Sequence, residues 1–328
     1  MPESPRLSSS EIGVLWMTYQ QKTMILTMLE YFIEQADDPE AKQIMTNLRS
    51  TMQPYVGKIE SMYRAEDLPV PIGFTKEDVN KGVPKLFDNG FDIMFLRLVE
   101  EITMGMHTLN LTMSYRQDVT LLYQELTQIT QKCYDDCTQF LLTKGYLPKS
   151  PYVAVQKQVE HAKGTNYLGM FNPIKGKRAL NTVEIAHIHH SIESNVTGMQ
   201  MIFGFAQCAT YQEVSNYFHK GGELAKGLVK EMSEVFLQND LQVPSTAGGN
   251  FTTSKIPPFS DKLMMYCVSL FCSFSLGGNS LGTAFSLRND LPVKLSVFMK
   301  DVFEYAHDGA KIMIKHGWME EPPQTIKH

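Results

Sequence analysis

Two Glu-x-x-His pairs are the residues of this chain whose types and spacing could do chemistry. They are Glu184 with His187 and Glu304 with His307. Residues three apart on a helix project to one face, so the carboxylate and the imidazole of each pair can reach the same ion. Helical bundles that bind two irons carry this spacing on two helices and a single Glu on each of the other two. The pairs therefore predict a metal site, and iron, zinc and manganese are the ions that suit these ligands.

The elements that position the two pairs belong to the second of two copies of one sequence unit. Residues 9–12 (SSEI) match residues 182–185 (TVEI) at an offset of 173. Residues 113–119 (MSYRQDV) match residues 285–291 (FSLRNDL) at an offset of 172. A register held over that length indicates an internal duplication.

Each copy predicts four long helices. In the first copy, apolar spacing and capping residues predict helices that begin near positions 9, 39, 87 and 118 and end near positions 36, 66, 116 and 145. The second copy repeats this pattern, and a long connection joins the second and third helices of each. We therefore expect an all-α protein of two tandem antiparallel four-helix bundles. The first bundle spans residues 1–146, a linker spans 147–179 and the second bundle spans 180–328.

The first copy cannot hold the predicted metal site. Its Glu11 is followed three residues later by Val14 rather than by a histidine. Lys132 and Asp135 occupy the positions that match the second Glu-x-x-His pair. Any metal is therefore expected in the second copy alone.

The second copy also lacks a complete set of ligands for two irons. Glu231 and Glu234 are the candidate carboxylates on its second helix, and residues 263–287 offer none on the third. Two alternatives remain. One is a single ion held by the two histidines and one carboxylate. The other is no ion at all, with Glu184 as an acid at the start of a helix, where the helix dipole favours negative charge. The second alternative is favoured, so no cofactor is expected.

Composition and motifs exclude several other classes of function. The net charge of −5 and the pI near 6.0 give no electrostatic reason to expect a nucleic-acid partner. No glycine-rich phosphate motif and no nucleophile elbow is present. The five cysteines include no CxxC pair, which argues against a disulfide framework and a structural zinc site. The first residues lack a signal-peptide pattern, so a cytoplasmic location is expected.

One segment is long and uncharged enough to suggest a membrane span. Residues 263–287 carry no charged side chain, but they include several serines and glycines. Their counterpart in the first copy carries Arg97, Glu100 and Glu101. A repeated element that is charged in one copy predicts a bundle helix, so no membrane span is expected.

Several motifs resemble one protein family. They are the Leu-x-Val-Pro joint after the second helix, the Ser-x-Arg-x-Asp turn before the fourth, PFSDKLMM at residues 258–265 and DGAKIMI at residues 308–314. From about Leu7 to Pro323 the chain resembles DUF3231, an uncharacterised two-repeat family of endospore-forming bacilli. The resemblance implies a ferritin-like fold and a distant relation to spore-coat proteins. It supplies no catalytic residues.

The predicted function is that of a non-catalytic structural or interaction protein, associated with sporulation or stress in a bacillus. Its partner would be another protein or a second copy of this chain, and the forespore or spore coat is an alternative location. Two other functions stay open. One is a metal-binding bundle confined to the second copy. The other is a binder of a small apolar ligand, which a cavity lined by Cys267, Phe271 and Phe274 would support.

Overall fold

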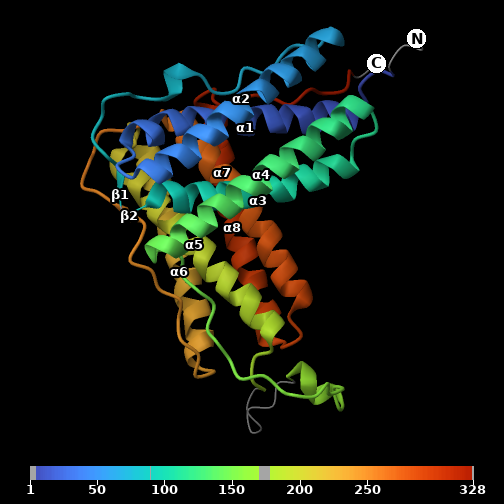
Figure 1. The fold of residues 1–328 in the computed structure, drawn as a ribbon, viewed down its shortest axis with the longest axis vertical. Helices are drawn as coiled ribbons and strands as arrows, with labels where there is room; N and C mark the ends of the chain where they lie inside the picture. The colour runs from blue at the N-terminus through green and yellow to red at the C-terminus, as the bar shows by residue number, and fades with distance from the viewer. Residues whose placement is uncertain (1–4, 89, 170–177, 327–328) are drawn as a thin grey trace.

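The computed structural model describes residues 5–88, 90–169 and 178–326, and within them the chain forms eight α-helices (Figure 1). Those of the first copy are α1 (Ser9–Gln35), α2 (Pro39–Ala65), α3 (Phe91–Thr112) and α4 (Gln117–Lys144). Those of the second copy are α5 (Thr182–Cys208), α6 (Gln212–Leu237), α7 (Asp261–Phe285) and α8 (Asp290–Lys315). The all-α prediction and the repeated order of helices are confirmed.

Matched capping residues begin the first helix of each copy. Ser8 caps α1 and Asn181 caps α5, and in both cases the glutamate three residues later accepts a hydrogen bond from the backbone of the cap. Such a capping box satisfies amide groups that have no partner inside the helix. Gly145, in the left-handed conformation, ends α4 as glycine commonly does. The two copies therefore start their helices with the same local chemistry.

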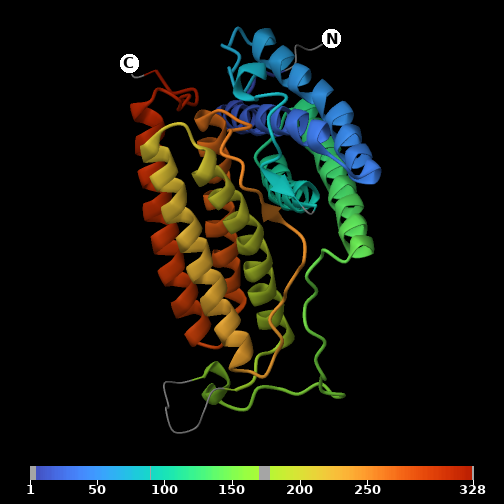
Figure 2. The ribbon, with the colours of Figure 1, turned by 90° about the vertical axis from the view of Figure 1, so that its left-hand side faces the viewer.

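The four helices of the second copy form a closed antiparallel bundle (Figure 2). Both α5 and α8 pack on α6 and α7. Residues 238–260, between α6 and α7, run back along the bundle, so α7 starts beside the end of α5. The carboxylate of Asp261, at the start of α7, accepts hydrogen bonds from the backbone amides of Thr210 and Tyr211 at 3.0 and 2.9 Å. This long crossover reverses the direction that α7 and α8 would have in a simple up-and-down bundle.

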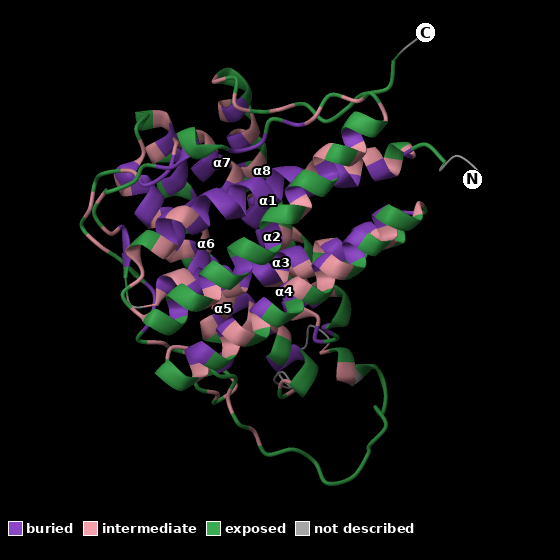
Figure 3. Ribbon diagram, turned by 45° about the horizontal axis from the view of Figure 1, so that its top comes forward, coloured by how far each residue is buried: buried purple, intermediate pink, exposed green. Residues whose placement is uncertain are grey.

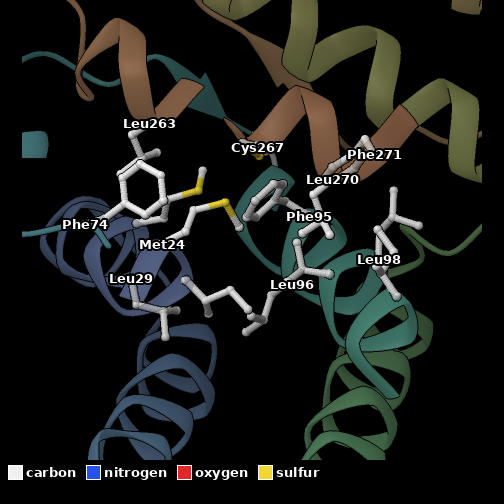
Figure 4. Packing of buried hydrophobic residues seen from close by; sticks show 14 of the residues in the cluster. Met24, Leu29, Phe74, Phe95, Leu96, Leu98, Leu263, Cys267, Leu270 and Phe271 are labelled. Atoms are coloured by element: carbon white, nitrogen blue, oxygen red, sulfur yellow. The ribbon is translucent and has the colours of Figure 1, made fainter. Parts of the chain in front are cut away.

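One cluster of buried hydrophobic residues spans the two copies, and a second lies within the second bundle around Ile188, Met232 and Leu295. Figure 3 shows the buried residues in purple. Figure 4 shows α7 of the second copy lying against α1 and α3 of the first. The rings of Phe95 and Phe271 stack with their centroids 5.9 Å apart, and those of Phe74 and Tyr266 are 5.0 Å apart. The interior of the first copy is therefore closed in part by a helix of the second.

A short antiparallel pairing joins the two crossing connections. Strand β1 (Phe87–Asp88) pairs with β2 (Asn250–Phe251), with Phe87 opposite Phe251. Two short 3₁₀ helices, Lys76–Asp78 and Thr165–Leu168, lie in the first connection and in the linker. None of the helices in the described ranges is long and apolar enough to cross a membrane.

Candidate functional site

The carboxylate of Glu184, the first residue of the predicted metal set, is engaged in holding the fold together. The side chain is fully buried, and its oxygens accept hydrogen bonds from the Arg178 guanidinium at 2.6 and 2.8 Å. The backbone amides of Asn181 and Arg288 donate to it at 3.0 and 3.1 Å. Burial acts to raise the pKa of Glu184, but the hydrogen bonds outweigh it and lower the pKa. Glu184 thus ties the start of α5 to the turn between α7 and α8.

Glu11 has the same role in the first copy. Its carboxylate accepts hydrogen bonds from the backbone amides of Tyr115 and Arg116, in the turn between α3 and α4, at 2.9 and 2.7 Å. Burial acts to raise the pKa of Glu11, but the hydrogen bonds from Arg116 and Ser8 lower it to about 2. Both copies use the matched glutamate to join a helix start to a turn, which explains Glu184 without a metal.

The other three residues of the predicted set do not come together with Glu184. The ring of His187 stacks on Phe285 with the centroids 5.8 Å apart, and burial lowers its pKa. Glu304 and His307 lie on the exposed face of α8, where Glu304 pairs with Lys300 at 3.1 Å. Among the described residues, no group of three or more His, Cys, Asp or Glu side chains is placed to hold a metal ion.

The two Glu-x-x-His pairs lie apart because of the crossover between α6 and α7. In an up-and-down bundle the first turns of the first helix and the last turns of the fourth lie at the same depth. Here Glu184 contacts Arg288, just before the start of α8, whereas His307 lies near the other end of that helix. The separation along α8 is roughly 25 Å at the α-helical rise per residue. The two Glu-x-x-His pairs therefore lie at different depths in the bundle and cannot share one metal ion.

A mostly apolar cavity of about 70 Å³, partly open at the surface, lies between the helices of the second bundle. All four helices of the bundle and Leu98 of α3 contribute to its wall. Phe271 and Phe274 line it, as the apolar-ligand hypothesis required, but Cys267 does not. The Cys267 sulfur instead contacts the sulfur of Met201 at 3.7 Å. The remaining large apolar side chains of the wall are Ile202, Leu224, Leu228, Val268, Phe298 and Val302.

One buried polar group faces this apolar space. Tyr305 lines the cavity and is only 3% exposed. Burial and the neighbouring Tyr217 hydroxyl raise its pKa, but no described group forms a hydrogen bond of normal geometry with its hydroxyl. Its ring stacks on that of Tyr217, with the centroids 4.2 Å apart. A Cβ atom at Gly221 of α6 would overlap the Tyr305 hydroxyl, so the glycine makes room for it. A buried hydroxyl without a partner is costly, which makes this group a candidate contact for a bound molecule.

The matched region of the first copy contains buried charged side chains. Lys22 and Glu100 match Asn195 and Cys272, which line the cavity of the second copy. Lys22, Glu100 and the nearby His107 are fully buried. Among the described residues, the Lys22 amine, the Glu100 carboxylate and the His107 ring nitrogens have no hydrogen-bond partner.

These buried groups alter one another's protonation. Burial lowers the pKa of Lys22 and raises that of Glu100, while the opposite charge of each partner acts against the shift. Burial and the charge of Lys22 hold the pKa of His107 well below its usual value, which keeps its ring neutral. Sequence reasoning missed this centre. The signal was present, because two matched positions are charged in one copy and uncharged in the other.

A second polar cluster lies where α3 of the first copy meets α5 of the second. Arg97 donates to Glu193 at 2.5 Å and to the hydroxyl of Thr138 at 2.9 Å. His190 pairs with Glu101, and that hydrogen bond raises the pKa of His190. Each ion pair has one member in each copy, so the cluster fixes how the copies meet.

Comparison with known proteins identifies a family but not an activity. The chain matches the family model "Protein of unknown function (DUF3231)" over residues 1–159 and 168–328. No curated protein matches the sequence. A crystal structure described as a "putative spore coat protein" from Bacillus halodurans is similar at 16% identity with a TM-score of 0.44, covering 46% of this chain and 98% of that one. At that score the likeness supports no functional argument.

Proposed function

The chain belongs to the DUF3231 family of proteins of unknown function, and we propose that it is a non-catalytic binding protein whose second bundle holds a small, largely apolar molecule. The cavity beside Phe271 and Tyr305 carries this proposal. An engineered apolar cavity of about 150 Å³ inside a helical protein binds benzene or xenon, and the cavity of this chain, at about 70 Å³, is smaller but has a similar apolar lining. Burial of apolar surface supplies the driving force, and the Tyr305 hydroxyl offers one hydrogen bond.

Filling the cavity tests this proposal. We expect benzene to raise the unfolding temperature of the wild-type protein, since a ligand at ten times its Kd stabilises the folded state by about 1.4 kcal/mol. Ser275→Leu places a larger side chain in the cavity wall and is expected to abolish the shift. Ser273→Leu, on the exposed face of the same helix, is the matched control and should retain it. A wild-type protein whose unfolding temperature does not respond to benzene would refute the proposal.

Self-association is a second candidate function, favoured by the outer face of α8. Four large apolar side chains on this helix are more than half exposed: Val293, Val297, Phe303 and Ile314. At the angular spacing of an α-helix they fall within one third of its circumference. An exposed apolar row of this kind is typical of surfaces that bind other proteins.

Sedimentation at high micromolar concentration tests this second function. We expect dimers or larger assemblies of the wild type and monomers of the Phe303→Glu variant. Leu109→Glu, at an exposed apolar position on α3, should leave the association unchanged. Monomers of the wild type throughout this range would remove self-association as a function.

The setting we propose is sporulation or stress in a bacillus. It is supported by the resemblance to a family of endospore-forming bacilli. Immunoblots of growing and sporulating cells test it, because equal amounts of the protein in both would contradict a role tied to sporulation.

A further inference from the structure

The apolar cavity adjoins a smaller, more polar space nearer the start of α5. This vestibule is lined by His187, His190, Ser191 and Asn279 among others. The cavity and the vestibule have four wall residues in common, on α5 and α7: Ser194, Asn195, Phe274 and Ser275. Three of these four side chains are small or medium-sized and polar, so no large apolar side chain among the three separates the two spaces.

Each of the two spaces contains one buried hydroxyl without a partner. Tyr305 lines the cavity and Ser191 lines the vestibule, where its hydroxyl is more than nine-tenths buried. Neither oxygen has a hydrogen-bond partner among the described residues. Buried hydroxyl groups are normally hydrogen-bonded, so each of these two can accept a partner from a molecule that enters the space beside it.

The two hydroxyls lie towards opposite ends of the joined space. Tyr305 abuts Gly221, the lining residue of α6 that is nearest the turn between α5 and α6. Ile202 lines the same end of the cavity from α5, and Ser191 lies eleven residues earlier on that helix. At the rise of an α-helix this stretch measures about 16 Å. A ligand that contacts both hydroxyls must therefore be elongated.

The charged groups near the vestibule are already paired. His190 bonds to Glu101, and Arg97 bonds to Glu193 beside it. Among the described residues that line the two spaces, the buried polar atoms without a partner are the neutral hydroxyls of Tyr305 and Ser191. Burying a charged head group here would cost free energy without an opposite charge to offset it.

We infer that the joined space binds an elongated, uncharged molecule with an apolar middle and one hydrogen-bonding group at each end. This inference rests on the proposed function and specifies its ligand class. The apolar middle lies along Phe271 and Phe274, and the end groups bond to the hydroxyls of Tyr305 and Ser191.

Calorimetric titration with three probes of equal chain length tests the inference. Decane-1,10-diol is expected to bind about three- to tenfold more tightly than decan-1-ol, the gain that one additional net hydrogen bond supplies. Decanedioate, with two charged ends, is expected to bind more weakly than the diol. Equal affinity of the diol and the alcohol, or tighter binding of the dicarboxylate, would overturn the inference.

Two variants test whether the end groups of the ligand bond to the hydroxyls of Tyr305 and Ser191. Tyr305→Phe and Ser191→Ala should each reduce the advantage of the diol over the alcohol, while Tyr115→Phe, at an exposed position of the first copy, should preserve it. An unchanged advantage in both variants would also overturn the inference. If the diol and the alcohol bind alike but benzene still stabilises the protein, the inference fails and the proposed function stands. If none of these molecules binds, both fail.

Discussion

Lys22→Met is expected to lower the free energy of unfolding by about 3–5 kcal/mol at neutral pH, the typical cost of leaving a buried charge without the opposite charge that offsets its burial. Lys22 and Glu100 are both fully buried, and no hydrogen bond from another described side chain would stabilise the carboxylate that remains. Urea unfolding followed by circular dichroism measures the change.

A variant that carries both Lys22→Met and Glu100→Met separates the effect of charge on stability from the effect of packing. Replacing both Lys22 and Glu100 with methionine removes the two charges and keeps most of the buried volume, so we expect stability close to that of the wild type or above it. The matched residue Asn195 in the second copy provides a control, because Asn195→Met removes no charge. A double variant that is as unstable as Lys22→Met would show that the two charges are not coupled.

The loss in Lys22→Met should grow as the pH rises. Burial raises the pKa of Glu100, and without the Lys22 amine nothing opposes that shift. An acid whose pKa is higher in the folded state than in the unfolded state stabilises the fold below its unfolded pKa and loses that contribution as the pH rises. The variant should therefore be closest to the wild type near pH 5. A pH-independent difference would contradict the assignment.

Glu184→Ala is expected to destabilise the protein by about 3 kcal/mol, because it leaves the buried end of the Arg178 guanidinium and two backbone amides without their acceptor. The pKa of Glu184 is lowered, so its contribution is present above the unfolded pKa and is lost as the pH falls through the folded pKa. Denaturant unfolding between pH 3 and pH 7 measures both effects.

Three further measurements test whether the effect of Glu184→Ala comes from its buried hydrogen bonds. Glu11→Ala should have a similar effect, since Glu11 makes the matched contacts in the first copy. Glu304→Ala, at an exposed ion pair on α8, should change stability by less than about 1 kcal/mol. A metal chelator should change none of these values. Equal effects of Glu184→Ala and Glu304→Ala would contradict the structural role assigned to Glu184.

The duplication and the helices could be predicted from the sequence, because capping residues and helical periodicity are local signals. The depth of Glu184 relative to His307 could not, since it depends on the path of residues 238–260. A chain of that length can either return to the same end of the bundle or cross to the other. Local signals do not distinguish the two.

The buried polar residues were missed for a different reason. Every residue of α1 from Thr18 to Leu29 is buried, including Gln20, Gln21 and Lys22. Periodicity cannot identify the inner face of a helix that is covered on all sides, and here α7 of the other copy helps to cover it. The charged centre does leave a signal in the sequence, because Lys22 and Glu100 match the uncharged residues Asn195 and Cys272 of the second copy.

A crystal structure of the protein under xenon pressure tests the central claim most directly, because xenon enters dry apolar cavities without requiring the natural ligand. If the second bundle binds a small apolar molecule, we expect xenon in that bundle beside Phe271, Phe298 and Tyr305. We expect none in the matched region of the first copy around Lys22. A second bundle that is closed and free of xenon would contradict the claim that this protein binds a small apolar molecule there.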